Sequence, residues 1–193
     1  MNKAVISDRI YLKADEALQD VLNKELTYAI PSYNPDLPPL IIKNIGRISK
    51  DFVTIPSGRR DLVPDDYEII DKTLLVPVNI PEFQFELRPS QQEVYDKVNG
   101  STIINAPPSW GKTFTALAIV AKLGQKTLIV THTLALRAQW VEEIEYTMGF
   151  TPGIIGSGKM ELGPPIIVGN VQTLNKKIPE VRNLFGTVVL DEM

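Results

Sequence analysis

One short segment, residues 106–113, limits the possible fold more than any other part of the sequence. It reads Ala-Pro-Pro-Ser-Trp-Gly-Lys-Thr, follows an apolar β-branched run at 101–105, and precedes a helix-forming run at 114–122. A strand, a tight turn ending in Gly-Lys-Thr and a helix together make a phosphate-binding loop. In such a loop, backbone N–H groups and the positive end of the helix dipole face the anion. The sequence therefore predicts a phosphate site here.

The loop departs from the strict glycine-rich pattern, but it keeps the residues that carry the chemistry. The expected nucleotide-binding residues of the loop are Ala106, Pro107, Pro108, Ser109, Trp110, Gly111, Lys112 and Thr113. Lys112 supplies a positive charge for the β- and γ-phosphate oxygens, and the Thr113 hydroxyl can ligate Mg²⁺. Ala106 replaces the first glycine of the pattern. An indole cannot share the turn with phosphates, so we expect Trp110 to point away from them.

A second segment near the end of the sequence complements the loop. Residues 187–190 are apolar and β-branched, and Asp191 and Glu192 follow them directly. We expect a buried strand that delivers both carboxylates at its carboxyl end. Asp191 would hold Mg²⁺ together with Thr113, and Glu192 would polarise the attacking water. The predicted catalytic residues are therefore Lys112, Asp191 and Glu192, and the predicted cofactors are ATP and Mg²⁺.

The composition excludes several classes of site. The 193 residues contain no cysteine and one histidine, so neither disulfides nor a zinc site are expected, and a metal must be bound by oxygen atoms. No apolar run reaches eighteen residues, and the N-terminus lacks a signal-peptide pattern. We therefore expect no membrane span and a cytoplasmic location, within the host cell if the protein is viral.

The net charge of −3 is distributed unevenly. Residues 1–86 carry ten basic and fourteen acidic side chains, whereas residues 87–193 carry ten and nine. Neither part is basic in the manner of an isolated DNA-binding domain. Any contact with nucleic acid must therefore be local, with backbone amides and helix termini supplying much of it.

The pattern of residues predicts two domains, 1–80 and 81–193. The first contains short strand-like runs, at residues 4–6, 10–12, 40–43, 52–55 and 73–76, and a helix over 15–28. These features predict a small α+β domain that ends in a proline-flanked connector at 77–81. The turn at 56–60 carries Arg59 and Arg60, which either contact phosphate or form a solvated hairpin tip.

Strands and helices alternate in the second domain. Strands are predicted at 101–105, 127–131, 166–168 and 187–190, and helices at 90–99, 111–123, 134–148 and near 171–174. Apolar strands separated by helices imply a parallel sheet with helices on both faces. Ligands of such sheets bind at the carboxyl ends of the strands, where 106–113 and Asp191 both lie.

The order of these segments resembles the first RecA-like domain of a superfamily 2 helicase. Residues 87–91, Leu-Arg-Pro-Ser-Gln, are similar to the adenine-recognising segment, in which Arg88 and Gln91 would contact the nucleotide and Gln91 would bond the adenine edge. Residues 108–113 resemble motif I, 131–140 motif Ia, 169–173 the next DNA-contacting segment, and 191–193 an incomplete motif II. Gln-Trp in motif Ia suggests the UvsW-like and XPB-like phage and repair helicases. In those helicases a small DNA-engaging domain, similar to residues 48–56, precedes the motor.

The resemblance implies contacts between the protein and the DNA backbone. Thr133, Arg137 and Thr173 would bind phosphate through a hydroxyl, a guanidinium and a helix N-terminus. From the sequence alone, Arg137 could instead pair with Glu142 or Glu143. Trp140 fits core or interdomain packing better than base stacking.

The resemblance also implies a second RecA-like domain, which would complete the ATP site. Since the sequence stops inside motif II, we expect a truncated form, a split gene product or the leading part of an interrupted protein. Such a chain should bind ATP and DNA weakly, with little turnover and no translocation. The leading hypothesis is an ATP-dependent DNA helicase or branch-migration motor of recombination or repair. The alternatives are a double-strand translocase of the restriction or remodelling type and a non-catalytic binding module, and RNA is also possible as the track.

Overall fold

The structure, a computed structural model, describes residues 2–34 and 36–191 and divides into two compact units, Met1–Thr73 and Leu74–Met193. This division falls before the predicted boundary at residue 80. The reason is that the connector bonds to the second unit: the Val76 N–H donates to the Gln125 side chain, and the Val78 N–H donates to the Gly124 carbonyl. Residues 74–80 therefore belong with the larger unit.

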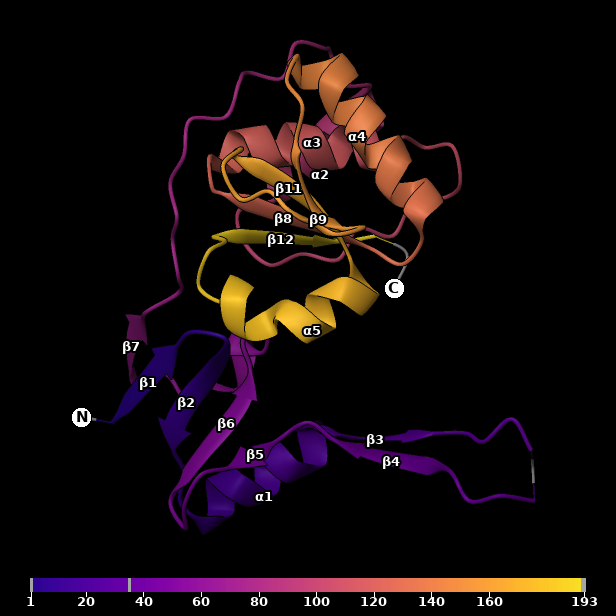
Figure 1. The fold of residues 1–193 in the computed structure, drawn as a ribbon. Coiled ribbons are helices and arrows are strands. Elements are labelled where there is room, and N and C mark those ends of the chain that lie inside the picture. The colour runs from indigo at the N-terminus through magenta and orange to yellow at the C-terminus, as the bar shows by residue number, and fades with distance from the viewer. Residues whose placement is uncertain (1, 35, 192–193) are drawn as a thin grey trace. The chain divides into compact units, whose positions relative to one another are not determined.

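The first unit is an α+β fold. Its elements are β1 (Lys3–Ile6), β2 (Arg9–Lys13), α1 (Glu16–Glu25), β3 (Thr27–Ile30), β4 (Leu40–Lys43), β5 (Gly46–Arg47), β6 (Phe52–Pro56), a 3₁₀ turn (Arg60–Leu62) and β7 (Glu68–Asp71). Five strands form one sheet in the order β5-β6-β2-β1-β7, and β3 and β4 form a separate antiparallel ribbon (Figure 1). The core places Leu22 and Leu26 from the helical segment against Ile10, Leu12 and Ile55 of the sheet, all fully buried.

One predicted strand of the first unit is wrong. Residues 73–76 form no strand, and the last strand of the sheet is instead β7, which pairs in parallel with β1. β7 reads Glu-Ile-Ile-Asp and lies at the sheet edge, with its first and third residues half-buried and the other two exposed. Because this edge strand has a charged residue at each end and is only partly buried, it does not form the long apolar run from which a strand is predicted.

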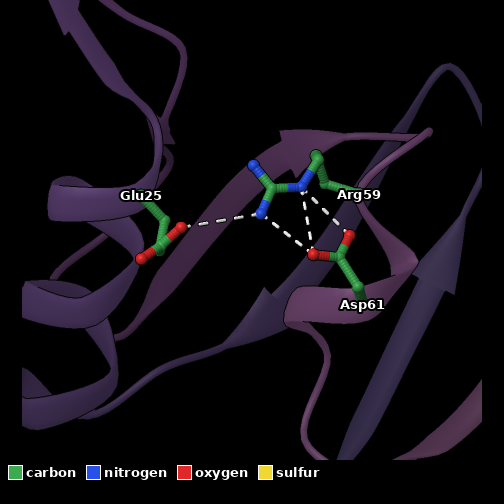
Figure 2. A network of polar contacts seen from close by, with 3 residues as sticks. All are labelled: Glu25, Arg59 and Asp61. Atoms are coloured by element: carbon green, nitrogen blue, oxygen red, sulfur yellow. Dashed lines mark hydrogen bonds and ion pairs between the residues drawn. The ribbon is translucent and has the colours of Figure 1, made fainter.

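The two arginines of the turn at 56–60 are paired with carboxylates. Arg59 bonds both oxygens of Asp61, at 2.9 to 3.2 Å, and lies 3.8 Å from a Glu25 oxygen (Figure 2). Arg60 pairs with Asp71 at 3.0 Å. The hydrogen bond from Arg59 lowers the pKa of Asp61 below its ordinary value. This turn is therefore a charge-compensated surface feature rather than an open cationic site.

The second unit is a three-layer α/β fold. Its elements are α2 (Pro89–Lys97), α3 (Lys112–Leu123), β8 (Thr127–Thr131), α4 (Leu134–Met148), β9 (Gly153–Gly156), β10 (Lys159–Met160), β11 (Ile166–Asn170), α5 (Val171–Val181) and β12 (Thr187–Leu190). The strand order is β10-β9-β11-β8-β12, in which the last four strands are parallel. The sheet therefore has the predicted parallel core.

Helices cover both faces of this sheet, as Figure 1 shows. On one face, Leu117 of α3 and Ile144 of α4 pack in a cluster with Ile129 and Val168. On the other, α5 contributes Leu174 to a second cluster that contains Leu128, Val130 and Ile167. Both faces of the central strands are apolar because both are covered. In the described part of the chain, no helix is long and apolar enough to cross a membrane.

The predicted strand at 101–105 is not present. These residues lie outside any ladder, and Ile103 is 95% exposed. A β-branched run has strand propensity, but it becomes a strand only when another strand pairs with it. The fourth parallel strand is instead β9, which the prediction missed because glycines flank its two isoleucines.

Candidate functional site

The loop before α3 has the backbone shape of an anion site. Ser109 and Gly111 both adopt positive φ, at 63° and 91°, and α3 begins immediately afterwards at Lys112. A Cβ atom added at Gly111 would lie only 2.6 Å from the Gln91 side-chain nitrogen. Both the left-handed backbone and the lack of space therefore require glycine at 111. The free N–H groups of the first helical turn, which includes Thr113, point out of this end of α3.

The Lys112 ammonium lies across the loop. Its Nζ donates to the Ala106 carbonyl at 3.2 Å, and the residue is half-buried. Among the described residues no carboxylate lies within ion-pair distance of it. An ammonium group has three donors, so a neutral carbonyl leaves its charge and two donors for an anion. Pro107, Pro108 and Ser109 form the exposed tip of the loop.

The N-terminal end of α2, with its N-cap Arg88, holds the loop in place. The Gln91 Nε2 donates to the Trp110 carbonyl at 3.0 Å, and the Arg88 guanidinium donates to the same oxygen. The Gln91 Oε1 accepts from the Arg88 backbone N–H at 2.9 Å, and Gln91 is 3% exposed. Both ends of this amide are therefore engaged with the protein. Contact of Arg88 and Gln91 with adenine stays a prediction.

Trp110 lies toward α2. Its indole Nε1 donates to the Ser90 Oγ at 3.2 Å. Ser90 stands where an aromatic residue is usual in the family that the sequence resembles. Here its hydroxyl accepts the hydrogen bond from the Trp110 indole. Three residues of one short segment, Arg88, Ser90 and Gln91, thus bond to Trp110 and fix the loop between the start of α2 and the start of α3.

Asp191 follows β12 at the carboxyl edge of the sheet. Its backbone N–H donates to the Val130 carbonyl at 3.3 Å, and its Oδ2 accepts from the Trp140 indole Nε1 at 2.8 Å. Trp140 is 2% exposed and belongs to the apolar cluster beneath α3 and α4. Sequence analysis assigned Trp140 to packing and did not foresee this bond. Glu192, the predicted water-activating residue, lies outside the described residues.

The oxygen donors suit magnesium bound with a nucleotide. Within the described ranges there is no group of three or more His, Cys, Asp or Glu side chains that could hold a metal alone. Mg²⁺ keeps several waters and is commonly bound by one or two protein oxygens and the substrate phosphates. The Thr113 hydroxyl and the Asp191 carboxylate are hard oxygen ligands of this kind. The residues present therefore fit Mg²⁺ as a partner of a phosphorylated ligand.

The three predicted nucleic-acid residues occupy the same edge of the sheet, after β8 and β11. Thr133 caps α4, because its Oγ1 accepts from the Leu136 N–H at 3.1 Å, and Thr173 lies in the first turn of α5. Arg137 does not pair with Glu142 or Glu143. Its guanidinium donates to the Asn170 Oδ1 at 2.9 Å and to the Ser157 Oγ at 3.0 Å.

Asn170 connects these segments, and sequence analysis missed it. It is 5% exposed, and its Nδ2 donates to the Thr133 carbonyl at 3.0 Å and to the Thr131 Oγ1 at 3.3 Å. Its Oδ1 accepts from Arg137. An asparagine between a buried strand and a helix is a helix-start signal, and this signal could have identified it. The amide therefore ties the loop after β8 to the end of β11.

The parallel sheet, the two layers of helices and the loop before α3 define a RecA-like P-loop domain. Comparison with known proteins gives the family: the model of the Type III restriction enzyme, res subunit, matches residues 84–193. The chain belongs to this family.

Three relatives extend this comparison. "Probable helicase D10" of Escherichia phage T5 is 42% identical over 195 residues, which cover 99% of this chain and 43% of that protein. "DNA 3'-5' translocase XPB2" of Sulfurisphaera tokodaii is 38% identical over 91 residues, or 47% of this chain and 20% of that protein. "Putative ATP-dependent RNA helicase QP509L" of African swine fever virus is 30% identical over 125 residues, or 58% of this chain and 24% of that protein. The chain spans less than half the length of these relatives.

Proposed function

We propose that this chain is part of an ATP-dependent helicase that acts on DNA in recombination or repair. The observation that carries the proposal is the Lys112 ammonium, which lies at the start of α3 and is bonded only to a neutral carbonyl in the described residues. A lysine at a helix N-terminus whose positive charge is not neutralised by a carboxylate is suited to bind a polyphosphate. The helicase names of the phage and viral relatives support the same function.

In the proposed reaction, the protein binds and orients the nucleotide. The amides of the Gly111 turn and the Lys112 ammonium would hold the β- and γ-phosphates, and the base would lie beside the segment that contains Arg88 and Gln91. Thr113 and Asp191 would hold Mg²⁺, which neutralises negative charge on the phosphate oxygens when bound. Glu192 would orient the attacking water and accept its proton.

The nucleic acid would lie along the edge formed by Thr133, Arg137 and Thr173. The Arg137 guanidinium bonds to neutral acceptors, so it keeps its positive charge for a phosphate. Thr173 lies in the first turn of α5, where unpaired N–H groups favour anions. Such contacts read no base sequence, so the same surface could follow DNA or RNA.

A second candidate activity is translocation on duplex DNA without strand separation. The restriction-enzyme description of the family and the translocase name of the archaeal relative favour it. Strand separation on a forked duplex and triplex displacement on an unbranched one distinguish the two activities, each measured with ATP, Mg²⁺ and a form of the protein that includes the second RecA-like domain. Unwinding of the fork supports the helicase, and displacement without unwinding supports the translocase.

Nucleotide binding can be tested directly on the 193-residue chain. A fluorescent ATP analogue is titrated, with Mg²⁺, against the parent chain and Lys112→Ala. We expect the variant to bind at least tenfold more weakly, about 1.4 kcal/mol, because a charge on the phosphates is lost. Lys97→Ala is the control, since Lys97 is exposed and pairs with Glu93 on α2. Equal binding by the parent and Lys112→Ala, or no binding by either, would contradict the proposal.

A further inference from the structure

A hydrogen bond connects the buried core of the second unit to the predicted metal carboxylate. The Trp140 Nε1 donates to the Asp191 Oδ2 at 2.8 Å. Trp140 comes from the middle of α4, and Asp191 follows β12, so residues 51 positions apart in the sequence meet here. No motif assignment in the sequence analysis gave Trp140 a chemical role.

The indole is a rigid anchor. It is 2% exposed and shares an apolar cluster with Leu117 and Val120 of α3 and with Ile144 of its own helix. A ring packed on all sides cannot rotate freely, and the indole N–H can only donate. The direction of this one donor is therefore fixed by the packing of α3 against α4.

The carboxylate has little other support. Its main chain is held by the bond from the Asp191 N–H to the Val130 carbonyl. Within the described part of the chain, the Trp140 indole is the side chain that bonds to its oxygens. One lone pair of Oδ2 is thus occupied, and Oδ1 accepts no hydrogen bond from the described residues. Outer hydrogen bonds of this kind set the orientation of metal-binding carboxylates.

We propose that Trp140 is a positioning residue, which holds the Asp191 carboxylate in the orientation that binds Mg²⁺ with the nucleotide. The inference rests on the proposed function, because it assigns to Asp191 the metal of the ATP site. Packing alone requires only a large apolar ring at 140, whereas positioning requires the N–H group.

Trp140→Phe tests this difference, because it keeps an aromatic ring and removes the donor. The midpoint of the Mg²⁺ titration is measured at a fixed concentration of fluorescent ATP analogue, and analogue affinity is also measured without Mg²⁺. We expect the Mg²⁺ midpoint to rise about tenfold, as for other lost outer-shell bonds, with little change in the metal-free affinity. An unchanged Mg²⁺ midpoint would overturn the inference.

Ile144→Val is the matched packing control. Ile144 is fully buried in the same cluster one turn further along α4. We expect the substitution to lower the thermal midpoint, because it removes a buried methyl group, and it removes no hydrogen-bond donor. We expect its Mg²⁺ midpoint to equal that of the parent. If Ile144→Val raises the Mg²⁺ midpoint as much as Trp140→Phe does, the effect is structural and the inference fails.

The indole N–H also reports on the bond without any ligand. The sequence has two tryptophans, so a ¹⁵N-labelled chain gives two indole signals, and Trp140→Phe identifies one of them. We expect Asp191→Ala to shift the Trp140 signal and leave the Trp110 signal in place. An unmoved Trp140 signal would overturn the pairing itself. A parent chain that binds no Mg²⁺-nucleotide, with the Trp140 signal still moved by Asp191→Ala, would instead overturn the proposed function and the role that depends on it.

Discussion

The two units contain turns of similar sequence that differ in what they do with their positive charge. One turn reads Pro-Ser-Gly-Arg-Arg at 56–60, and the other reads Pro-Ser-Trp-Gly-Lys-Thr at 108–113. In the first, both arginines pair with carboxylates, and the chain enters a 3₁₀ turn of three residues. In the second, Lys112 opens a helix of twelve residues and bonds to a neutral carbonyl. The two turns have similar sequences, but only the second has a positive charge that no carboxylate of the described residues neutralises. This difference, rather than the sequence of the turn, indicates which of them can bind an anion.

The same contrast holds for the arginines of the two units. Arg59 bonds to Asp61, a charged partner, whereas Arg137 bonds to the Asn170 amide and the Ser157 hydroxyl, which are neutral. Both guanidiniums are held in place, but only one keeps its net charge for an external phosphate. The comparison therefore ranks Lys112 and Arg137 above Arg59 and Arg60 as ligand-binding cations.

The largest effect is expected at the glycine of the second turn. Gly111→Ala forces a side chain into a left-handed backbone at φ 91° and against the Gln91 amide. We expect nucleotide affinity to fall about 100-fold, near 2.7 kcal/mol, as strain moves the loop away from the phosphates. Titration with a fluorescent ATP analogue measures the change, and circular dichroism checks the fold.

Gly58→Ala is the matched control in the first turn. Gly58 has no positive φ, and an added Cβ meets nothing within 4 Å. We expect its effect on stability to stay within about 0.5 kcal/mol, with nucleotide affinity unchanged. Similar losses of affinity in Gly111→Ala and Gly58→Ala would show that the two turns do not differ as the structure indicates.

A smaller effect is expected for nucleic-acid binding. Arg137→Ala should weaken binding of a DNA duplex about fivefold at moderate salt. The affinity should also fall less steeply with salt: the slope of log affinity against log salt should become less negative by about one, because one phosphate contact is lost. Fluorescence anisotropy over a salt series measures both quantities. Arg59→Ala should change neither, and an equal loss from both variants would argue against the assignment of Arg137.

A modest gain in stability is expected at Ser109. Its φ of 63° suits glycine better than serine, so Ser109→Gly should raise the free energy of unfolding by about 0.5–1 kcal/mol. Asn183, at φ 66°, provides the comparison, since asparagine tolerates this region and Asn183→Gly should give a smaller gain. Urea unfolding measures both, and a loss of stability in Ser109→Gly would contradict the expectation.

In the second unit, the sequence was sufficient to predict the helices and strands that depend on residues close together in the chain. Helix α4 was predicted with its observed bounds because its apolar residues recur at helical spacing and Gly149 follows them. The strands at 127–131 and 187–190 were also predicted with their observed bounds. Partner-dependent features were not predictable in this way. Residues 101–105 have the composition of a strand but no ladder, and β9 is a strand although glycines flank it.

In the candidate site too, contacts between residues far apart in the chain could not be predicted from the sequence. The Gly-Lys-Thr pattern indicates an anion loop from sequence alone, but the bonds that hold it come from residues twenty or more positions away, such as Ser90 to Trp110. The hydrogen bond between Asn170 and Arg137 and the one between Trp140 and Asp191 likewise join separate elements. Such contacts depend on how the sheet orders its strands, which spacing along the chain does not specify.

The smallest expected effect concerns the pH dependence of the first turn. The hydrogen bond from Arg59 lowers the pKa of Asp61 from its ordinary value of 3.8. A carboxyl with a lowered folded-state pKa stabilises the fold above that ordinary value, and the contribution is lost as the pH falls through the lowered pKa. The stability difference between the parent and Asp61→Asn should therefore be small at pH 7 and shrink below about pH 4, since Asp61 is exposed and screened. Urea unfolding from pH 2 to 7 measures it, and a difference that grows on acidification would mean that Arg59 does not compensate this charge.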